Sequence, residues 1–434
     1  MRVLFLTSRF PYPPVGGDRN RVFHFIRALA GAGHEVHLVS FDTAARSRPP
    51  EAIAPLESAL ASLRVVRLPR ILSAVRAFAA LPGTLPLQAA YYGSARMGAR
   101  VEEALARVKP DVVYTHLFRM APYALAAMPR HSAAWILDLT DVISSEIARS
   151  LEYRGGFDRW LYRVEGRRIA RYEQRVAPLF DRCWVVGGAE AKALAAVSPR
   201  ARIEVVPLGV DGGTTAGLEE ASPIAAGPHA SRGYAREPAT ILFFGFHRIF
   251  HNRDAARFLA RDIFPLVRAR IPDAVLEIAG KSSESLGGAA RGEGIRNLGF
   301  LADPEQAFAR ATVFVAPHRF AAGVQTKVLQ ALDSGAPVVT TPIVREGLEP
   351  IPDGILRVGE TPEEIAAEIV SLIRNPAVAR DLGERGRAWV RSRFTWDHAL
   401  RAFEDAGGCR RTDVFPLGLD GKRSEPSGET SLLR

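Results

Sequence analysis

GVQTKVLQALDSGAPVVTT, residues 323–341, passes from a loop into a helix and then into a strand. The apolar residues after Thr326 follow helical spacing, Gly335 ends the helix, and a short apolar run follows. Lys327 lies where the loop becomes the helix. A helix start offers free backbone N–H groups, so a cation there predicts an anion site.

The same alternation of strand and helix extends over most of the chain. Strand-like runs in the first half are RVLFLTS, EVHLVSF, DVVYTH, AAWILDL and RCWVVGG, and in the second half TILFFGF, AVLEIAG, TVFVAP and APVVTT. Strands that alternate with helices indicate parallel sheets. We therefore predict an α/β protein with two Rossmann-like, doubly wound domains.

Changes in composition suggest where these domains begin and end. We predict a first domain over 1–207, a Gly-, Ala-, Ser- and Pro-rich linker over 208–238, and a second domain over 239–390. A C-terminal helix over 391–406 and a mobile tail over 407–434 complete the prediction.

The charge of the chain is unevenly distributed. Residues 1–200 hold 28 Lys and Arg against 17 Asp and Glu, a net charge of +11, whereas the remaining residues hold −1. An excess of positive charge favours anionic partners such as lipid or phosphorylated substrates, although a solvated arginine-rich surface is the plainer interpretation. No nucleic-acid motif is present, so we expect no nucleic-acid partner.

Other features narrow the class of protein. No apolar run is long enough to span a membrane, and the N-terminus is typical of a buried strand rather than a signal peptide. Cys183 and Cys409 have no metal-ligand spacing, which favours a reducing cytoplasm. We therefore expect a cytoplasmic protein, at most peripheral at the inner face of the membrane.

In each predicted domain, a glycine-containing turn follows the first strand. Gly16 and Gly17 precede the first helix and would let backbone N–H groups face a phosphate, although a tight turn needs glycine anyway. Gly245 has the corresponding place in the second domain. Asn252 then fits an N-cap, and Arg248 could reach a diphosphate unless its loop is merely solvated.

Polar residues also end two strands of the first domain. His116 could hydrogen-bond sugar hydroxyls or be a satisfied structural histidine. Asp138 and Asp141 lie three residues apart, but two carboxylates are weak evidence for a metal, and we expect none. We assign them instead to shaping the acceptor side of a site.

The segment over 152–181 mixes arginines with Trp160, Tyr162 and Tyr172. It fits an amphipathic helix at a membrane interface. The alternative is a solvated helix whose arginines pair with Glu152, Asp158, Glu165 and Glu173.

Several motifs together resemble family four of the retaining glycosyltransferases, which have the GT-B fold. They are PYPPVGGDRNR (11–21), GHEVHLVSF (33–41) and GVQTKVLQALDSGAPVVTTPIVREGL (323–348). The stretches LPGTLPLQAAYYGSARM, ILDLTDVISS and RWLYRVEGRRIARYEQRVA further resemble sugar transferases associated with exopolysaccharide and exosortase (PEP-CTERM) systems. The final helices, around RSRFTWDHALRAFE, typically cross back onto the first domain in this family, and the two domains face across a cleft.

The resemblance implies a retaining, metal-independent hexosyltransferase without a cofactor, acting on a UDP- or GDP-linked sugar. The acceptor would be a carbohydrate or a lipid-linked molecule, with peripheral contact to an anionic membrane. Lys327, His116 and Arg248 are the predicted catalytic residues. Predicted donor-binding residues are Gly16, Gly17, Gly245, Asn252, Gly323, Val324, Gln325, Thr326 and Gln330; predicted acceptor-binding residues are Arg19 and Asp141.

The sequence departs from the family pattern at three positions. Ala322 and Gln330 stand where the broader family often has two glutamates, and Phe246 replaces a usual arginine. An amide at Gln330 can accept from one ribose hydroxyl and donate to the other, at a cost of ~1–2 kcal/mol against a carboxylate. Two alternatives stay open: a non-catalytic homologue that binds a sugar nucleotide or serves as a membrane-associated assembly subunit, and an epimerase of the same fold.

Overall fold

The computed structural model describes residues 1–434 except 15, 43–52, 211–238, 302–303, 322 and 409–434. Most of the predicted linker and nearly all of the predicted tail lie outside the described residues. The domain boundaries therefore stay a prediction.

The first half of the chain forms a parallel sheet of seven strands in the order β3-β2-β1-β4-β5-β6-β7. The strands are β1 (Arg2–Thr7), β2 (Glu35–Asp42), β3 (Ser62–Arg67), β4 (Val112–His116), β5 (Ala134–Thr140), β6 (Arg182–Val185) and β7 (Ile203–Val205). The helices are α1 (Gly17–Gly31), α2 (Ala54–Glu57), α3 (Arg70–Ala79), α4 (Leu87–Tyr91), α5 (Ala95–Val108), α6 (Ala121–Ala127), α7 (Ile143–Ser150), α8 (Gly156–Val176) and α9 (Gly188–Val197).

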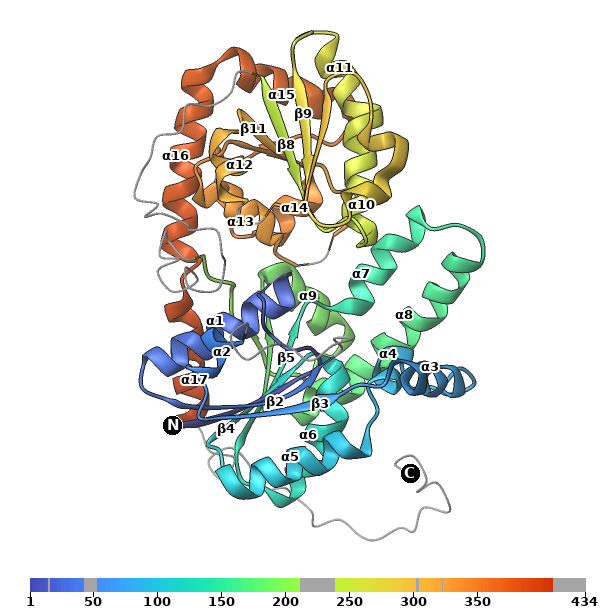
Figure 1. Ribbon diagram of the computed structural model, residues 1–434, viewed down its shortest axis with the longest axis vertical. Coiled ribbons are helices and arrows are strands. Elements are labelled where there is room, and N and C mark those ends of the chain that lie inside the picture. The colour runs from blue at the N-terminus through green and yellow to red at the C-terminus, as the bar shows by residue number, and fades with distance from the viewer. Residues whose placement is uncertain (15, 43–52, 211–238, 302–303, 322, 409–434) are drawn as a thin grey trace.

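A second parallel sheet has six strands in the order β10-β9-β8-β11-β12-β13. They are β8 (Thr240–Phe244), β9 (Val275–Ala279), β10 (Ile295–Gly299), β11 (Val313–Ala316), β12 (Val338–Thr340) and β13 (Arg357–Val358). The helices are α10 (Phe250–Phe258), α11 (Phe264–Arg268), α12 (Glu305–Arg310), α13 (Thr326–Asp333), α14 (Pro342–Gly347), α15 (Pro362–Arg374), α16 (Pro376–Arg393) and α17 (Trp396–Gly408). The predicted α/β class with two Rossmann-like domains is confirmed (Figure 1).

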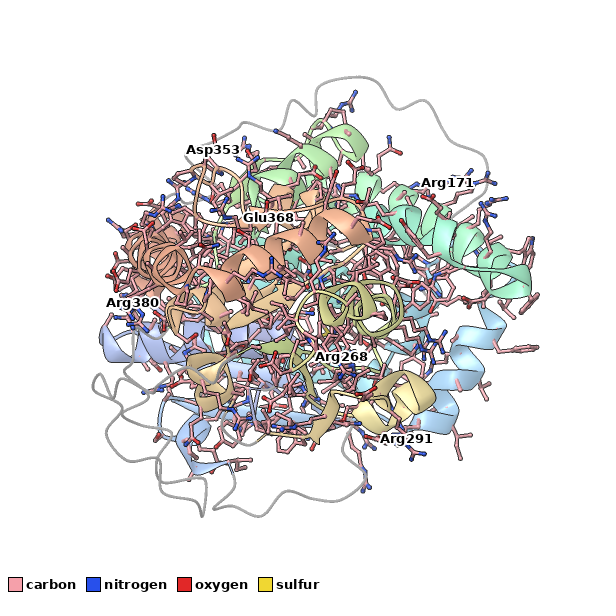
Figure 2. The ribbon with its side chains drawn as sticks, turned by 90° about the horizontal axis from the view of Figure 1, so that it is seen from above. Arg171, Arg268, Arg291, Asp353, Glu368 and Arg380 are labelled. Atoms are coloured by element: carbon pink, nitrogen blue, oxygen red, sulfur yellow. The ribbon has the colours of Figure 1, made fainter. Side chains whose placement is uncertain are left out.

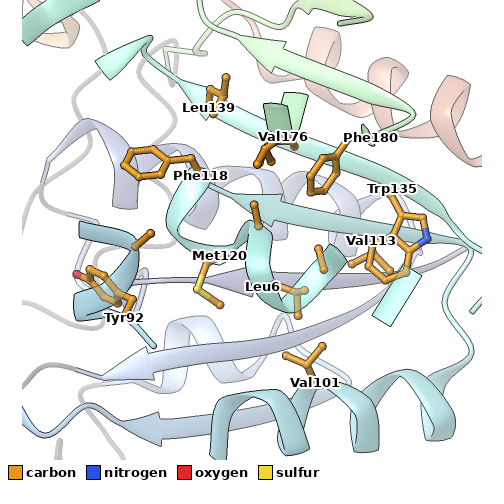
Figure 3. Close-up of a cluster of buried hydrophobic side chains, with 14 of the residues drawn as sticks. Leu6, Tyr92, Val101, Val113, Phe118, Met120, Trp135, Leu139, Val176 and Phe180 are labelled. Carbon is orange, nitrogen blue, oxygen red and sulfur yellow. The ribbon is translucent and has the colours of Figure 1, made fainter. Parts of the chain in front are cut away.

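Each sheet has its own apolar core. The central strands are buried on both faces, which explains why they are continuous apolar runs. One core cluster of the first domain packs Phe118, Trp135 and Phe180 beneath the helices on one face of the sheet (Figure 3). These cores hold the strand ends, and the loops that follow them, in fixed positions.

The C-terminal helix returns to the first domain, as predicted. α16 runs along the second domain, and α17 continues down to the first, where the chain's N-terminus also lies (Figure 1). Trp396 stacks on His24 of α1 with ring centroids 4.6 Å apart. Phe403 packs edge-on against Trp184, with centroids 4.7 Å apart. Aromatic contacts therefore hold α17 on the first domain, and the chain joins it to α16 of the second.

Both sheets reverse their strand order at one place, between β1 and β4 and between β8 and β11. Open parallel sheets bind ligands at such switch points, beyond the carboxyl ends of the strands. Gly16 and His116 follow or end β1 and β4, while Gly245 and His318 follow β8 and β11. The topology thus brings most of the predicted site residues to these two edges.

Candidate active site

Lys327 lies in the first turn of α13 with its amino group inside the protein. The side chain is only 7% exposed. Its Nζ donates a hydrogen bond to Asn252 Oδ1 and lies 3.0 Å from His318 Nε2. An ammonium has three N–H groups, so two protein partners leave one for a ligand.

The electrostatics of this site favour an incoming anion. Burial lowers the pKa of Lys327 to about 7, because water no longer solvates the ammonium. Burial, with the nearby Lys327 charge, holds the pKa of His318 well below its usual value, so its imidazole is neutral. A negative ligand would restore the charge on Lys327 and be held by it.

Asn252 is not the predicted N-cap, and its predicted donor-binding role stays a prediction. We expected it to cap a helix, but α10 begins at Phe250 and its N-cap is Ile249. Asn252 instead lies inside the first turn, where its Nδ2 donates to Phe246 O over 3.1 Å while its Oδ1 faces Lys327. The amide thus fixes the Gly245 loop to Lys327.

The Gly245 loop packs closely against this amide. A Cβ added to Gly245 would lie 3.2 Å from Asn252 Cγ. His247 is buried in the same loop, with its Nε2 3.0 Å from Ala279 O. Arg248 points outward, and within the described residues it has no hydrogen bond or ion pair. The structure therefore does not bring Arg248 to Lys327, and its catalytic role stays a prediction.

The Gly16–Gly17 turn of the first domain approaches α13 of the second. Gly16 has φ 97°, a left-handed conformation that glycine adopts without strain. A Cβ added to Gly17 would lie 3.7 Å from Thr326 Cγ2. The predicted phosphate-facing turn and the predicted cation therefore lie on opposite sides of one boundary between domains.

His116 ends β4 close to that turn. Burial lowers its pKa to about 4, so the imidazole is neutral near pH 7. Its Nε2 is 3.4 Å from Thr140 Oγ1, and its Nδ1 has no hydrogen-bond partner among the described residues. A neutral, buried imidazole with an unpartnered nitrogen suits a hydrogen bond to an uncharged group better than proton abstraction.

The two aspartates after β5 differ in environment. Asp138 is fully buried and accepts a hydrogen bond from Arg21 Nε at 2.6 Å, so it forms a buried ion pair in the core of the first domain. Asp141 lies at the domain boundary, where a Cβ added to Gly323 would overlap its Oδ1. Burial and the nearby Glu190 raise the pKa of Asp141 well above its usual value.

The Gly323 loop belongs to the second domain, but residues of the first domain also hold it. Glu190 Oε1 accepts a hydrogen bond from Gly323 N at 2.8 Å, and its Oε2 accepts one from Val142 N at 2.6 Å. Arg149 Nη1 donates to Ala321 O at 3.3 Å. The loop that leads to Lys327 is therefore positioned by both domains.

The remaining predicted donor residues surround the start of α13. Val324 and Gln325 are buried, Thr326 is half-buried and Gln330 is exposed. Arg19, the other predicted acceptor residue, is half-buried in the first turn of α1. Their roles stay predictions.

Comparison with known families assigns both halves of the chain. Residues 16–209 match the model described as "Glycosyl transferase 4-like domain", and residues 238–375 match "Glycosyl transferases group 1". The protein is a GT-B glycosyltransferase. No curated protein sequence matches the chain.

Solved structures of similar fold agree with this assignment. Sucrose-phosphate synthase from Thermosynechococcus elongatus has 17% identity and a TM-score of 0.65, with 93% of this chain and 98% of that chain covered. Anabaena Alr3699/HepE, solved with UDP and glucose, has 13% identity and a TM-score of 0.63, covering 94% and 99%. TarM has 10% identity and a TM-score of 0.66, also covering 94% and 99%.

Two residues of this glycosyltransferase were missed by sequence reasoning. His318, which lies beside Lys327, follows the buried strand β11 by two positions, and a polar residue at a strand's carboxyl end is a usable signal. Glu190 lies in the first turn of α9, and nothing in the sequence relates it to Gly323. Only the packing of the two domains reveals that contact.

Among the described residues, no helix of the glycosyltransferase combines the length and apolar character needed to cross a membrane.

Proposed function

We propose that the protein is a retaining hexosyltransferase that moves a sugar from a UDP- or GDP-linked donor to a hydroxyl group. The observation that carries the proposal is the buried Lys327 amino group, held by Asn252 beside neutral His318 at the switch point of the second sheet. A similar fold has been solved with UDP-glucose in Anabaena Alr3699/HepE, which supports a nucleotide-sugar donor.

The leaving group sets the chemical requirement of the site. Glycosyl transfer releases a nucleoside diphosphate, on which negative charge grows as the sugar–oxygen bond breaks. Lys327 and the N–H groups at the start of α13 can stabilise this charge without rearranging. A lysine that serves this purpose makes a metal ion unnecessary, so we propose that the reaction is metal-independent.

The acceptor hydroxyl group must also lose a proton. In the proposed retaining course it attacks from the face that the diphosphate leaves, and the departing phosphate oxygen accepts the proton. His116, which is neutral and lies at the end of β4, would orient the sugar by a hydrogen bond rather than act as the base. No carboxylate base is then needed.

A donor panel tests the proposal. The protein is incubated with UDP- and GDP-sugars and with simple or lipid-linked glycosides, and the released nucleoside diphosphate is measured. We expect turnover that persists with a metal chelator and falls by at least about a hundredfold in Lys327→Ala. Lys192→Ala, which alters an exposed lysine of α9, is the control. Equal turnover in both variants would contradict the role of Lys327.

Calorimetric titration with UDP and GDP tests the donor side separately. If Gln330 binds the ribose, Gln330→Glu should keep or improve affinity, and Gln330→Ala should weaken it by roughly tenfold. Unchanged affinity in both variants would remove Gln330 from the ribose site while leaving the diphosphate site intact.

We further propose an acceptor from polysaccharide or glycoconjugate biosynthesis, carried by a carbohydrate or a lipid. The TarM structure with α-GlcNAc-glycerol and UDP is consistent with an acceptor of the first kind in this fold. A lipid-linked acceptor would be met at a membrane surface. Peripheral contact with an anionic membrane is therefore part of the proposal, supported by the net charge of +11 on residues 1–200.

A further inference from the structure

Helix α3 exposes its apolar residues instead of burying them. Ile71 is 83% exposed and Phe78 is 74% exposed, with Val75 and Leu72 at 57% and 45%. Positions 71, 75 and 78 lie on one face of a helix. The one buried residue of α3 is Ser73, so the face toward the protein is the polar one. A soluble surface seldom presents such a row.

A second apolar group lies at the start of α8. Phe157 and Trp160 are 74% and 57% exposed, and their rings stack with centroids 5.5 Å apart. α3 and α8 project from the same side of the molecule in both views (Figures 1 and 2). Arg168 of α8 donates to Leu81 O just after α3, which joins the two helices.

α8 also carries a row of exposed arginines at four-residue intervals. They are Arg159, Arg163, Arg167, Arg171 and Arg175, and among the described residues none of their side chains makes an ion pair or a hydrogen bond. Figure 2 shows Arg171 at the outer edge of the molecule.

The carboxylates of α8 are occupied elsewhere. Glu165 is buried and accepts a hydrogen bond from Leu87 N at 2.7 Å, and Glu173 accepts one from Ser144. Asp158 pairs with Arg154 at 2.8 Å. The alternative from the sequence, in which these arginines pair with nearby acids, therefore holds for Arg154 with Asp158 and for Arg168, whose Nη1 lies 4.0 Å from Glu165 Oε2, but not for the arginine row.

We propose that α3 and the exposed side of α8 form a docking surface for an anionic lipid bilayer. The apolar side chains of α3 and the Phe157–Trp160 pair would enter the interface, and the arginine row would contact lipid phosphates. The positive charge of this surface favours an anionic bilayer as the partner. Residues 62–86 contain four arginines and no acidic residue, and the side chains of the arginine row on α8 are unpaired among the described residues. A protein partner would need a matching acidic surface as well as an apolar one.

The surface lies at the acceptor side of the site. β3 leads directly into α3, and all strands of the first sheet are parallel, so α3 begins at the same edge as the Gly16–Gly17 turn. A bilayer against α3 would present a lipid-linked acceptor to that edge. Only the presentation of a lipid-linked acceptor rests on the proposed function. The docking to a bilayer is inferred from the exposed residues of α3 and α8 alone.

Vesicle co-sedimentation of the full chain tests the docking. Wild-type protein should bind vesicles of phosphatidylglycerol and phosphatidylcholine at low salt, and should bind neither pure phosphatidylcholine vesicles nor mixed vesicles at high salt. Replacing Arg163, Arg167 and Arg171 by Gln should lower the partition coefficient by on the order of a hundredfold. The combination Ile71→Ser, Val75→Ser and Phe78→Ser should lower it by roughly tenfold or more.

Matched controls lie on the second domain. Arg261, Arg291 and Arg380 are exposed and unpaired among the described residues, and their replacement by Gln should leave binding unchanged; so should Phe300→Ser. Circular dichroism and turnover of a soluble acceptor should be unaltered in every variant, which excludes misfolding.

Equal losses in the test and control variants would overturn the docking surface, as would binding that ignores lipid charge. Absence of vesicle binding combined with self-association that Phe78→Ser abolishes would assign α3 to a second copy of the chain instead. Vesicle binding without any glycosyl transfer would overturn the proposed function and leave the docking surface standing.

Discussion

In the proposed function, the protonation of Lys327 is coupled to the binding of a diphosphate. Burial lowers the pKa of Lys327 to about 7, whereas an ordinary lysine has 10.5. A bound diphosphate favours the ammonium and raises that pKa. Above pH 7 the ligand must therefore recruit a proton to bind fully.

We predict that affinity for UDP or GDP falls as the pH rises above 7, by up to about tenfold per pH unit until the pKa of the complex is reached. Calorimetry between pH 7 and 9 measures this, and buffers of different ionisation enthalpy reveal the proton uptake. Lys327→Arg should flatten the dependence, because a guanidinium stays charged. The same dependence of affinity on pH in the wild type and in Lys327→Arg would contradict this role of Lys327.

A second prediction concerns Glu173 and the stability of the fold. Burial raises its pKa from 4.5 to about 7, and its Oε1 has no partner among the described residues. The folded state therefore favours the neutral acid, and stability present below pH 4.5 is lost as the pH rises to about 7. This loss corresponds to ~3 kcal/mol in the free energy of unfolding.

Glu173→Gln should keep the contact with Ser144 and remove that loss. Denaturant unfolding at pH 5 and pH 8 should show the variant gaining on the wild type at the higher pH. Glu152→Gln, which changes an exposed acid, is the control. A variant equally shifted at both pH values would show that Glu173 is already ionised in the folded protein.

At the scale of elements, the Gly323 loop joins the two domains. Gly323 has φ 56°, and a Cβ there would overlap Asp141 Oδ1. Gly323→Ala should displace the loop, break the hydrogen bond to Glu190 and lower turnover by at least about tenfold. Gly98→Ala, in a helix with room for a methyl group, should have little effect.

The steric origin of that effect can be separated from backbone strain. Adding Asp141→Ala to Gly323→Ala removes the overlap but leaves the left-handed φ. The melting temperature should then recover in part. No recovery would assign the whole defect to strain.

The elements themselves were largely predictable, because buried parallel strands are apolar runs between helical patterns. Gly16, Gly245 and Lys327 could be placed because strand ends and helix starts are readable from the sequence. The start of α10 could not be predicted from the sequence. Asn252 is a good N-cap residue, but its side chain lies inside the first turn and hydrogen-bonds Phe246 O. His318 could have been found from its place just after β11, whereas the contact of Glu190 joins distant segments and no local pattern encodes it.

At the scale of the whole molecule, two parallel sheets direct the ends of β1 and β4 and of β8 and β11 toward one boundary. α17 and the Gly323 loop hold the domains together there. In the proposed function, a donor diphosphate lies against the second domain and an acceptor against the first. Transfer with retention then requires both ligands on the same face of the sugar.

The stereochemical course of the reaction tests this account most directly. The product formed from an α-linked nucleotide-sugar donor is followed by proton NMR from the first turnovers, before any anomeric equilibration. We predict an α-glycoside that appears in step with free nucleoside diphosphate, and a rate that collapses in Lys327→Ala but not in Lys192→Ala. A β-glycoside as the first product, or an α-glycoside formed equally fast without Lys327, would contradict it.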